Sequence, residues 1–529
     1  MNVGLLAIDQ LVAALAAERP PVLLDVRDLV ECEGGHLPGA AIVPRRRLEF
    51  RIDALVPDRS TPMVVIDSGV EIAPGVRDPR AALAADTLLA FGYREVAVLE
   101  GGVAAWRLAG LPTVSGTQVS SKAFGRRIGD LERVPTVDVA TLRQWQQSGR
   151  RIALCDVRSP GEHTEDCIPG AVSLPGFEAV SHALDMAAES DVIVLCSSAR
   201  TRSLIVARTL IDMGLSDVVA LDGGLLAWRL AGHELERGSR RRRVQPSNAG
   251  RQFAELGSAR LAKHHGVDWI EATELAAMVD ATEVDFHAFD LRNLGQHGVA
   301  HVPRSVPVAC DVLLVRRNEL VALQEAPVVL VDDDAVRAHL AAVWLRRLGQ
   351  SRVRVLAGGF AAWINAGRPA RTAADLPLGW REASAAAPGL GVEDVARWLA
   401  AHTPARVLHV DSAASWRRGH LPGAHWLPRG WLEARIAALA PSPAEALLVT
   451  CADGTQSAYA AATLRQRGYA NVAWLQGGTR VWASAGRGLA TASEPLQDDD
   501  GLLLPARRDA QAMREYLDWE RLARRTDQA

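Results

Sequence analysis

One pattern recurs four times along the 529 residues and constrains the fold more than any other feature. In each copy an apolar, strand-like run ends in a Gly-Gly pair, and a tryptophan follows shortly afterwards. The copies are Gly101-Gly102 with Trp106, Gly223-Gly224 with Trp228, Gly358-Gly359 with Trp363, and Gly477-Gly478 with Trp482. They recur roughly every 120 to 135 residues, which is the size of one compact domain. We interpret each copy as a strand-to-helix turn whose glycines permit close approach and whose tryptophan fills the core.

A second pattern opens each repeat, with an acidic residue at a strand end and a proline-containing turn after it. The turn has Pro-Gly in the first, second and fourth repeats and is degraded in the third, where Pro303 is followed by Arg304. The segments are Leu23-Leu24-Asp25-Val26-Arg27 with Gly35-His36-Leu37-Pro38-Gly39-Ala40, Leu154-Cys155-Asp156-Val157-Arg158 with Ile168-Pro169-Gly170-Ala171, Phe289-Asp290-Leu291-Arg292 with Ala300-His301-Val302-Pro303, and Val410-Asp411 with Gly419-His420-Leu421-Pro422-Gly423-Ala424. The fourth has no arginine two residues after its aspartate. A buried Asp/Arg pair at a strand end is interpreted as structural.

Strands that alternate with helices predict an α/β fold with a parallel sheet covered by helices on both faces. The chain therefore reads as four such domains and a tail, since single cores stop growing well below this length. The expected ranges are 1–115, 131–238, 264–375 and 388–492, with a helical tail over 493–529. In the tail Met513, Tyr516, Leu517 and Leu522 follow roughly helical spacing, so this helix is expected to dock on a domain or on a second copy of the chain, giving a homo-oligomer.

The composition of the chain limits the classes of partner and the kinds of site that can be expected. The formal net charge of −3 gives no reason to expect nucleic acid or a membrane surface as partner. The basic run Ser239–Arg243 is interpreted as a solvated linker. The six cysteines, at 32, 155, 167, 196, 310 and 451, are too scattered for a disulfide framework and lack metal-site spacing. With neither a leader-like N-terminus nor an apolar run near 18 residues, the chain is expected to be cytoplasmic.

The stretch around Cys451 carries the clearest chemistry. The apolar run Leu447–Val449 leads into Thr450 and Cys451, a Gly-containing turn follows, and a helical pattern starts near Ser457. Backbone N–H groups in such a strand–loop–helix turn point inward and hold an anion, assisted by the helix dipole. A cysteine held there is expected to tend toward the thiolate. In open parallel sheets, ligands bind beyond the carboxyl ends of the strands, where this turn lies.

With these residues in view, the chain resembles a tandem-repeat rhodanese, a sulfurtransferase. That family has an Asp-x-Arg strand, a Gly-His-x-Pro-Gly-Ala turn, a catalytic cysteine on a short anion-binding loop and a closing Gly-Gly-x-x-x-Trp. The resemblance covers all four repeats and implies transfer of sulfane sulfur, from thiosulfate or a persulfide donor to a thiol, a protein thiol or cyanide, through a cysteine persulfide. No metal or organic cofactor is needed for this reaction, because the cysteine carries the sulfur itself.

The family's nucleophile does not carry over to repeats one and three. The equivalent strands end in Asp67 and in Asp332-Asp333-Asp334, and a carboxylate cannot form a persulfide. In repeat one the loop beyond Asp67 is lengthened through Arg77. Both repeats are predicted to be inactive scaffold.

Repeat two allows two registers. A six-residue loop ending at Arg202 starts at Ser197 and leaves Cys196 one place early. If Cys196 is the nucleophile, the loop is one residue longer, as in the related dual-specificity phosphatases. By resemblance, Arg200 and Arg202 neutralise thiosulfate.

Repeat four has the family's loop length from Cys451 to Gln456, with Gly454 where the family has glycine, but Gln456 replaces the usual arginine. The sequence thus predicts two catalytic thiols, Cys196 and Cys451, with substrate held by Arg200, Arg202, Gly454, Gln456 and Ser457. Cys196 is expected to be the faster toward thiosulfate, because its arginines attract the donor. Two alternatives stay open: a phosphatase or arsenate reductase acting at the longer Cys196 loop, and a non-catalytic sulfur-carrier or interaction protein.

Overall fold

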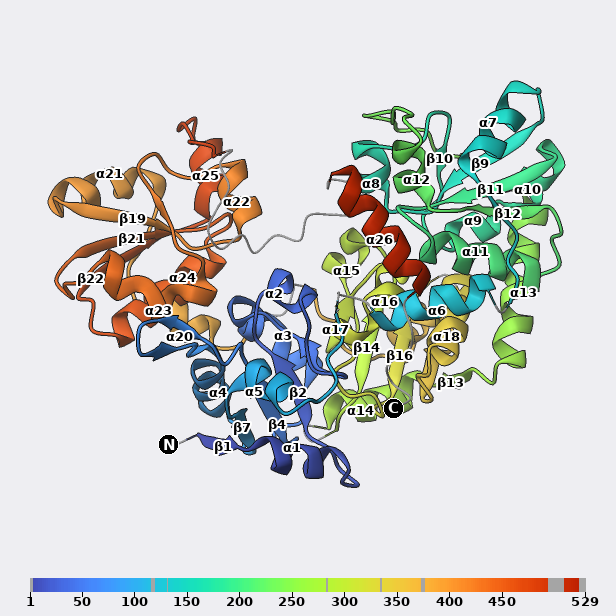
Figure 1. The fold of residues 1–529 in the computed structure, drawn as a ribbon. Helices are drawn as coiled ribbons and strands as arrows, with labels where there is room; N and C mark the ends of the chain where they lie inside the picture. Colours follow the sequence, from blue (N-terminus) through green and yellow to red (C-terminus); the bar gives the residue numbers. More distant parts are fainter. Residues whose placement is uncertain are drawn as a thin grey trace. The chain divides into compact units, whose positions relative to one another are not determined.

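The computed structural model describes residues 3–115, 119–130, 132–281, 284–333, 335–372, 376–492 and 509–522. It contains four five-stranded sheets, one for each repeat, in which the strand pairs are parallel. Helices flank each sheet (Figure 1). The predicted α/β class and the four parallel sheets are confirmed. Asp334 and the tail segments 493–508 and 523–529 lie outside the described residues.

The first two repeats place their strands and helices in similar chain order. Repeat one and the helix after it comprise β1 (Gly4–Leu6), α1 (Ile8–Leu15), β2 (Val22–Asp25), α2 (Leu29–Glu33), β3 (Ala41–Ile42), η1 (Arg45–Arg47), α3 (Leu48–Leu55), β4 (Met63–Ile66), β5 (Glu71–Ala73), β6 (Val76–Arg77), α4 (Arg80–Ala90), β7 (Val96–Leu99), α5 (Gly102–Leu108) and α6 (Val119–Asp130). Repeat two comprises β8 (Thr136–Val137), α7 (Val139–Gln147), β9 (Ile152–Asp156), α8 (Pro160–Glu165), β10 (Val172–Ser173), α9 (Glu178–Ser181), α10 (Ala183–Glu189), β11 (Val192–Cys196), α11 (Thr201–Asp212), β12 (Val218–Leu221) and α12 (Gly224–Leu230).

The remaining elements follow the same scheme. Repeat three, with the helix before it, comprises α13 (Asn248–His264), β13 (Asp268–Ile270), α14 (Ala272–Asp280), β14 (His287–Asp290), α15 (Leu294–Val299), β15 (Ser305–Pro307), α16 (Cys310–Val315), α17 (Arg317–Leu320), β16 (Val328–Val331), α18 (Ala335–Arg347), β17 (Val353–Leu356) and α19 (Gly359–Asn365). Repeat four and the tail comprise α20 (Trp380–Ala385), β18 (Gly389–Leu390), α21 (Val392–Ala401), β19 (Ala405–His409), α22 (Ala413–Arg418), β20 (His425–Trp426), α23 (Arg429–Leu439), β21 (Ala446–Thr450), α24 (Thr455–Gln466), β22 (Asn471–Leu475), α25 (Gly478–Ser484) and α26 (Ala510–Leu522).

The strand order places the same loop at the centre of every sheet. The orders are β1-β7-β4-β2-β3, β10-β9-β11-β12-β8, β13-β17-β16-β14-β15 and β18-β22-β21-β19-β20. The middle strands β4, β11, β16 and β21 are buried along their whole length, which explains their uninterrupted Val, Ile and Leu runs. The loop that leaves each middle strand lies between strands whose connections run in opposite directions, where α/β sheets bind ligands.

The four repeats assemble as two compact units, and the division does not follow chain order. Unit 1 contains repeats one and four, over Met1–Thr117 and Asp375–Leu502. Unit 2 contains repeats two and three and the C-terminal helix, over Gln118–Ala374 and Leu503–Ala529. Repeats one and four are therefore partners despite standing at opposite ends of the sequence.

The Gly-Gly pairs have the predicted structural role. The first glycine of each pair caps the following helix in the left-handed region, at φ of 67° to 69° for Gly101, Gly223, Gly358 and Gly477, which an L-residue with a side chain rarely adopts. Each tryptophan then donates its indole N–H to a carbonyl six residues further on. This bond ties the end of each repeat to its last helix.

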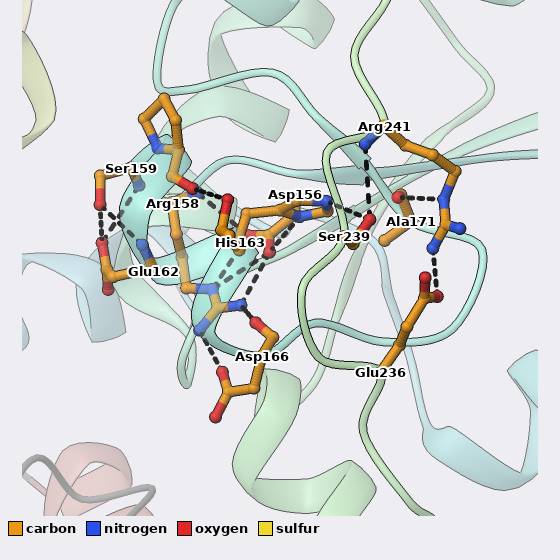
Figure 2. Close-up of polar contacts among 12 residues, drawn as sticks. Asp156, Arg158, Ser159, Glu162, His163, Asp166, Ala171, Glu236, Ser239 and Arg241 are labelled. Atoms are coloured by element: carbon orange, nitrogen blue, oxygen red, sulfur yellow. Dashed lines mark hydrogen bonds and ion pairs between the residues drawn. The ribbon is translucent and has the colours of Figure 1, made fainter.

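The strand-end Asp/Arg pairs are buried ion pairs beneath the loops. In repeat two, Arg158 binds Asp156 through Nε and Nη2 and reaches Asp166 through Nη1, while His163 bridges Asp156 and Ser239 (Figure 2). Asp25–Arg27 and Asp290–Arg292 repeat the pair.

In repeat four the alignment expected from the sequence is wrong by two residues. Asp156 and Asp25 stand opposite the last residues of β11 and β4, and the residue opposite the last residue of β21 is His409. Asp411 therefore occupies the place of the arginine. At this position repeat four has a carboxylate where the other three repeats have a guanidinium paired with an aspartate.

The basic connecting segment packs more closely than expected, and the tail helix docks on a repeat. The Ser239–Arg243 run is not simply a solvated linker: Arg241 pairs with Glu236 and donates to the Ala171 carbonyl at 3.2 Å (Figure 2). Arg243 pairs with Glu189. Helix α26 buries Met513 and Leu517 against Ala199 and Leu226 of repeat two. Its apolar face thus docks within the chain, which is one of the two outcomes expected from the sequence.

Among the described residues, no helix combines the length and the apolar character that a membrane crossing requires.

Candidate functional site

A single backbone contact identifies the equivalent loop residue in all four repeats. The second glycine of each pair lies against a carbonyl at the start of the loop. A methyl group on Gly102, Gly224, Gly359 or Gly478 would lie 2.6, 2.1, 2.0 or 2.3 Å from the carbonyl oxygens of Asp67, Ser197, Asp332 and Cys451, respectively. Three of these carbonyls also accept a helix N–H, from Val103, Leu225 and Thr479, at 3.0, 3.0 and 2.8 Å. Asp67, Ser197, Asp332 and Cys451 therefore occupy one structural position.

This contact decides between the two registers of repeat two. Cys196 is the last residue of β11, is fully buried, and pairs in the ladder with Asp156. Ser197 stands where repeat four has Cys451, and its hydroxyl lies 3.3 Å from that of Ser203, as the Cys451 sulfur lies 3.4 Å from that of Ser457. The geometry favours the shorter loop that starts at Ser197. Cys196 is then a strand residue, one place before the loop.

The sulfur of Cys451 lies in the predicted nest. It accepts the backbone N–H groups of Gly454 and Ser457 at 3.1 and 3.4 Å. Gly454 reaches this position at φ 91°, and a Cβ there would lie 2.8 Å from the Gly477 nitrogen, so the loop needs glycine. The structure thus brings together Cys451, Gly454 and Ser457 from the sequence prediction.

The expectation that the nest favours the thiolate is wrong for the resting site. Burial and the nearby Asp411 carboxylate raise the pKa of Cys451 to about 11, although the Ser457 hydroxyl and backbone N–H act in the opposite direction. Asp411 accepts the Ala452 N–H at 3.2 Å and so lies beside the loop. A thiol with this pKa is nearly all protonated at neutral pH, and its reactivity depends on how well the loop donors hold the anion.

In repeat one a carboxylate fills the same nest. Asp67 accepts the N–H groups of Gly69 and Ala81 at 2.9 and 3.1 Å. Burial and the adjacent Asp78 raise the pKa of Asp67 to about 6. The loop is longer here because the β5–β6 hairpin is inserted before Arg80. In repeat one the Asp67 carboxylate therefore accepts backbone N–H groups at the position where repeat four holds the Cys451 sulfur.

In repeat three the nest position is closed by an ion pair. Arg337 binds Asp332 through Nε and Nη2 at 2.9 and 2.6 Å. Arg337 stands five residues after Asp332, as Gln456 stands five after Cys451, so the loop-end arginine is bound to the residue that replaces the cysteine.

The two arginines of repeat two have carboxylate partners. Arg202 binds Glu162 at 2.9 and 2.7 Å and contacts Asp311 at 3.3 Å. Arg200 lies 2.9 Å from Asp222. Helix α26 covers this loop, and Glu520 accepts the Thr201 hydroxyl at 2.8 Å. The residues expected to attract thiosulfate are therefore paired inside the protein.

Gln456 does not line the nest but turns toward repeat one. Its Oε1 accepts Nε of Arg429 at 2.8 Å, and its Nε2 donates to the Arg46 carbonyl at 3.0 Å. Sequence reasoning missed Arg429, Arg46 and Glu49 around this site. The missing loop-end arginine is the one signal in the sequence, because a buried glutamine amide requires partners.

In the parts of the chain that the structure describes, no cluster of three or more histidine, cysteine or acidic side chains has the arrangement of a metal site.

Comparison with known proteins agrees with this geometry. The model of the rhodanese-like domain family matches residues 8–109, 138–231, 271–366 and 392–485. A crystal structure of thiosulfate sulfurtransferase from Pseudomonas aeruginosa is 30% identical, covers 98% of this chain and 96% of its own, and superposes with a TM-score of 0.86. A sulfurtransferase from Allochromatium vinosum is 30% identical over 95 residues, which is 18% of this chain and 88% of that protein.

A second curated relative shares only a domain. The HTH-type transcriptional regulator Rv0324 of Mycobacterium tuberculosis is 37% identical over 98 residues. The match covers 18% of this chain and 39% of the regulator, so it concerns one repeat.

Proposed function

The chain belongs to the rhodanese-like domain family, and from this premise we propose that it is a sulfurtransferase in which Cys451 carries the sulfur. The donor is thiosulfate or a persulfide, and the acceptor is a thiol, a protein thiol or cyanide. Repeats one, two and three are proposed to be inactive in sulfur transfer.

One observation supports this assignment above the others. Of the four equivalent loop positions, those of repeats one to three hold Asp67, Ser197 and Asp332, and only repeat four places a sulfur there. That sulfur already accepts two backbone N–H groups of its loop. The proposal replaces the sequence-based prediction that Cys196 is the faster thiol.

The proposed reaction has two steps. The Cys451 thiol first gives its proton to water. The thiolate then attacks the outer sulfur of thiosulfate, the S–S bond breaks, and sulfite leaves with the bonding electron pair. The persulfide anion on Cys451 is held by the Gly454 and Ser457 N–H groups, which point to the place where its charge develops. An acceptor thiolate then attacks the outer sulfur of that persulfide and restores the Cys451 thiolate, as in covalent ping-pong catalysis.

Persulfide trapping tests the assignment directly. After treatment with thiosulfate and alkylation, peptide mass measurement is expected to find the added sulfur on Cys451. The same measurement on the peptide that contains Cys196 serves as an internal control, because that thiol lies in a strand. Sulfur on Cys196 and none on Cys451 would refute the proposal.

A further expected result concerns Asp67 and Asp332. Changing both to alanine is expected to leave the rate of sulfur transfer unaltered, because neither carboxylate shares a repeat with Cys451. Transfer is measured per folded molecule, since Asp67→Ala also removes the acceptor for two loop N–H groups. A large loss of turnover in the folded double variant would mean that one of these acids takes part in catalysis.

The two alternative functions, an enzyme acting at the Cys196 loop and a non-catalytic carrier, require different features of the structure. A phosphatase or arsenate reductase activity needs the Cys196 sulfur inside a wider loop, and this residue ends β11. A non-catalytic sulfur carrier or interaction protein fits the three repeats without a loop cysteine, but gives no role to the donors around Cys451. Persulfide formation without turnover to an acceptor would favour the carrier.

A further inference from the structure

The loop of Cys451 is anchored from outside its own repeat. Gln456, which is 5% exposed, is held at both ends of its amide, by Arg429 Nε at 2.8 Å and by the Arg46 carbonyl at 3.0 Å. The next residue is Ser457, whose backbone N–H donates to the Cys451 sulfur. Fixing Gln456 therefore fixes the first turn of α24, and with it one of the two backbone donors to the sulfur.

Arg429 is in turn held by repeat one. Its Nη1 binds Glu49 Oε1 at 3.0 Å, its Nη2 binds the second oxygen of Glu49, and Nη2 also donates to the Arg46 carbonyl at 3.0 Å. Both side chains of this ion pair are 4% exposed. Burial opposes ionisation of Glu49, but the guanidinium groups of Arg429 and Arg45 together outweigh it and lower the pKa of Glu49 to about 2. The pair is thus charged throughout the neutral range, and all three arginine nitrogens are used.

The same cross-repeat contact recurs at two other loop ends. Arg202 of repeat two reaches Asp311 of repeat three at 3.3 Å, and the guanidinium of Arg80 of repeat one lies 3.8 Å from the ring centre of Trp431 of repeat four. The loop-end residue of one repeat therefore meets the segment after the third strand of its partner. In those repeats no sulfur depends on the contact, and in repeat four it supports the loop that holds one.

We infer that Glu49, Arg429 and Gln456 form a positioning relay through which repeat one orients the sulfur-holding loop of repeat four. Repeat one, whose own loop carries Asp67 in place of a cysteine, then supplies part of the Cys451 site. None of the three touches the reacting sulfur, so they are positioning residues. The inference rests on the proposed role of Cys451.

The substitution Arg429→Lys tests the relay. Lysine keeps the charge but has one nitrogen, which cannot hold Gln456, Glu49 and the Arg46 carbonyl together. The loop donors then hold the anion less well. We expect the pH profile of Cys451 alkylation by iodoacetamide, read by peptide mass, to move to higher pH. We also expect kcat of sulfur transfer to fall by about tenfold or more, since small misplacements at a reacting centre are costly.

The chain offers a matched control in Arg45→Lys. Arg45 is the counterpart of Arg429 in repeat one, is 6% exposed, and binds Glu49 and, across the repeats, Glu433 at 3.0 and 3.2 Å. Its guanidinium binds Glu49 but makes neither of the two contacts that hold the Gln456 amide, which come from Arg429 and the Arg46 carbonyl, and lysine retains a cation beside Glu49. We expect the alkylation profile and kcat of this variant to match the wild type. An equal loss in both variants would assign the effect to the repeat interface as a whole and overturn the relay.

A second variant, Gln456→Met, breaks only the last link. It conserves side-chain size and leaves the Arg429–Glu49 pair in place, so it is expected to reproduce the shifted alkylation profile. A wild-type profile in both Arg429→Lys and Gln456→Met would refute the relay. Alkylation needs no sulfur donor, so the alkylation profiles test the relay independently of the proposed sulfurtransferase activity. That activity is refuted by a different result, the absence of a persulfide on Cys451 in the wild-type protein.

Discussion

Cys451→Ser is expected to abolish thiosulfate-dependent sulfur transfer, with a loss of at least about 100-fold, whereas Cys196→Ser is expected to retain it. A hydroxyl at position 451 can keep the loop hydrogen bonds but cannot form a persulfide. The protein contains the same replacement naturally, because Ser197 occupies the equivalent place in repeat two. The measurement is the initial rate of transfer by each single variant, per folded molecule.

The control for this pair of variants has to allow for stability. Cys196 is fully buried at the end of β11, so serine there costs about 1–3 kcal/mol of folding free energy if its hydroxyl finds no partner. Cys196→Ala avoids the buried hydroxyl and is expected to transfer sulfur at the wild-type rate. If folded Cys196 variants lose transfer while Cys451→Ser keeps it, the equivalence of Ser197 and Cys451 is wrong.

Gly478→Ala is expected to reduce sulfur transfer by roughly 100-fold, because a displacement of about 1 Å at a reacting centre has effects of that size. Gly478 lies at φ 62°, and an added Cβ would stand 2.3 Å from the Cys451 carbonyl oxygen and 2.6 Å from the Asp453 nitrogen. Backbone atoms cannot yield as a flexible side chain would. The loop has to move, and the donors to the sulfur move with it.

Repeat three supplies the matched variant, Gly359→Ala. Its added Cβ would lie 2.0 Å from the carbonyl oxygen of Asp332, at φ 61°, so the local strain is comparable. Denaturant unfolding is expected to detect a loss of stability in both variants, and transfer rates a loss only for Gly478→Ala. Equal transfer rates for the two folded variants would show that the position of the Cys451 loop does not control the reaction.

Much of the fold can be predicted from sequence because its signals are local. Gly-Gly turns need left-handed backbone, and buried middle strands need unbroken apolar runs, so both recur visibly at domain spacing. The Cys451 nest is predictable for the same reason, since strand, glycine and helix start are adjacent in the chain.

Two assignments are difficult from the sequence because several local alignments are equally good. Asp411 matches the strand-end aspartates by sequence because it is the acid before the Gly-His-x-Pro turn, and only the ladder partner of Thr450 identifies His409 instead. Cys196 is predicted to be catalytic because it is a cysteine, although it lies one residue before the start of the six-residue loop. The contact with Gly224, which resolves that offset, joins residues far apart in sequence.

The raised pKa of Cys451 and the partners of Gln456 could not be predicted from the sequence. The pKa depends on burial and on Asp411, and burial is a property of the assembled domain. Gln456 is held from repeat one, more than 400 positions earlier in the chain. No periodicity in the sequence identifies which repeats become partners.

The nested division of the chain has a consequence for biosynthesis. After Thr117 has been added to the nascent chain, the whole of Gln118–Ala374 is made before the second part of unit 1 begins at Asp375. At about 5–20 residues per second this takes on the order of tens of seconds. During that time Arg45 and Glu49 of repeat one have no partner from repeat four. Because charged side chains are well hydrated, this part of the surface of repeat one can remain exposed to water without promoting aggregation while the nascent chain grows.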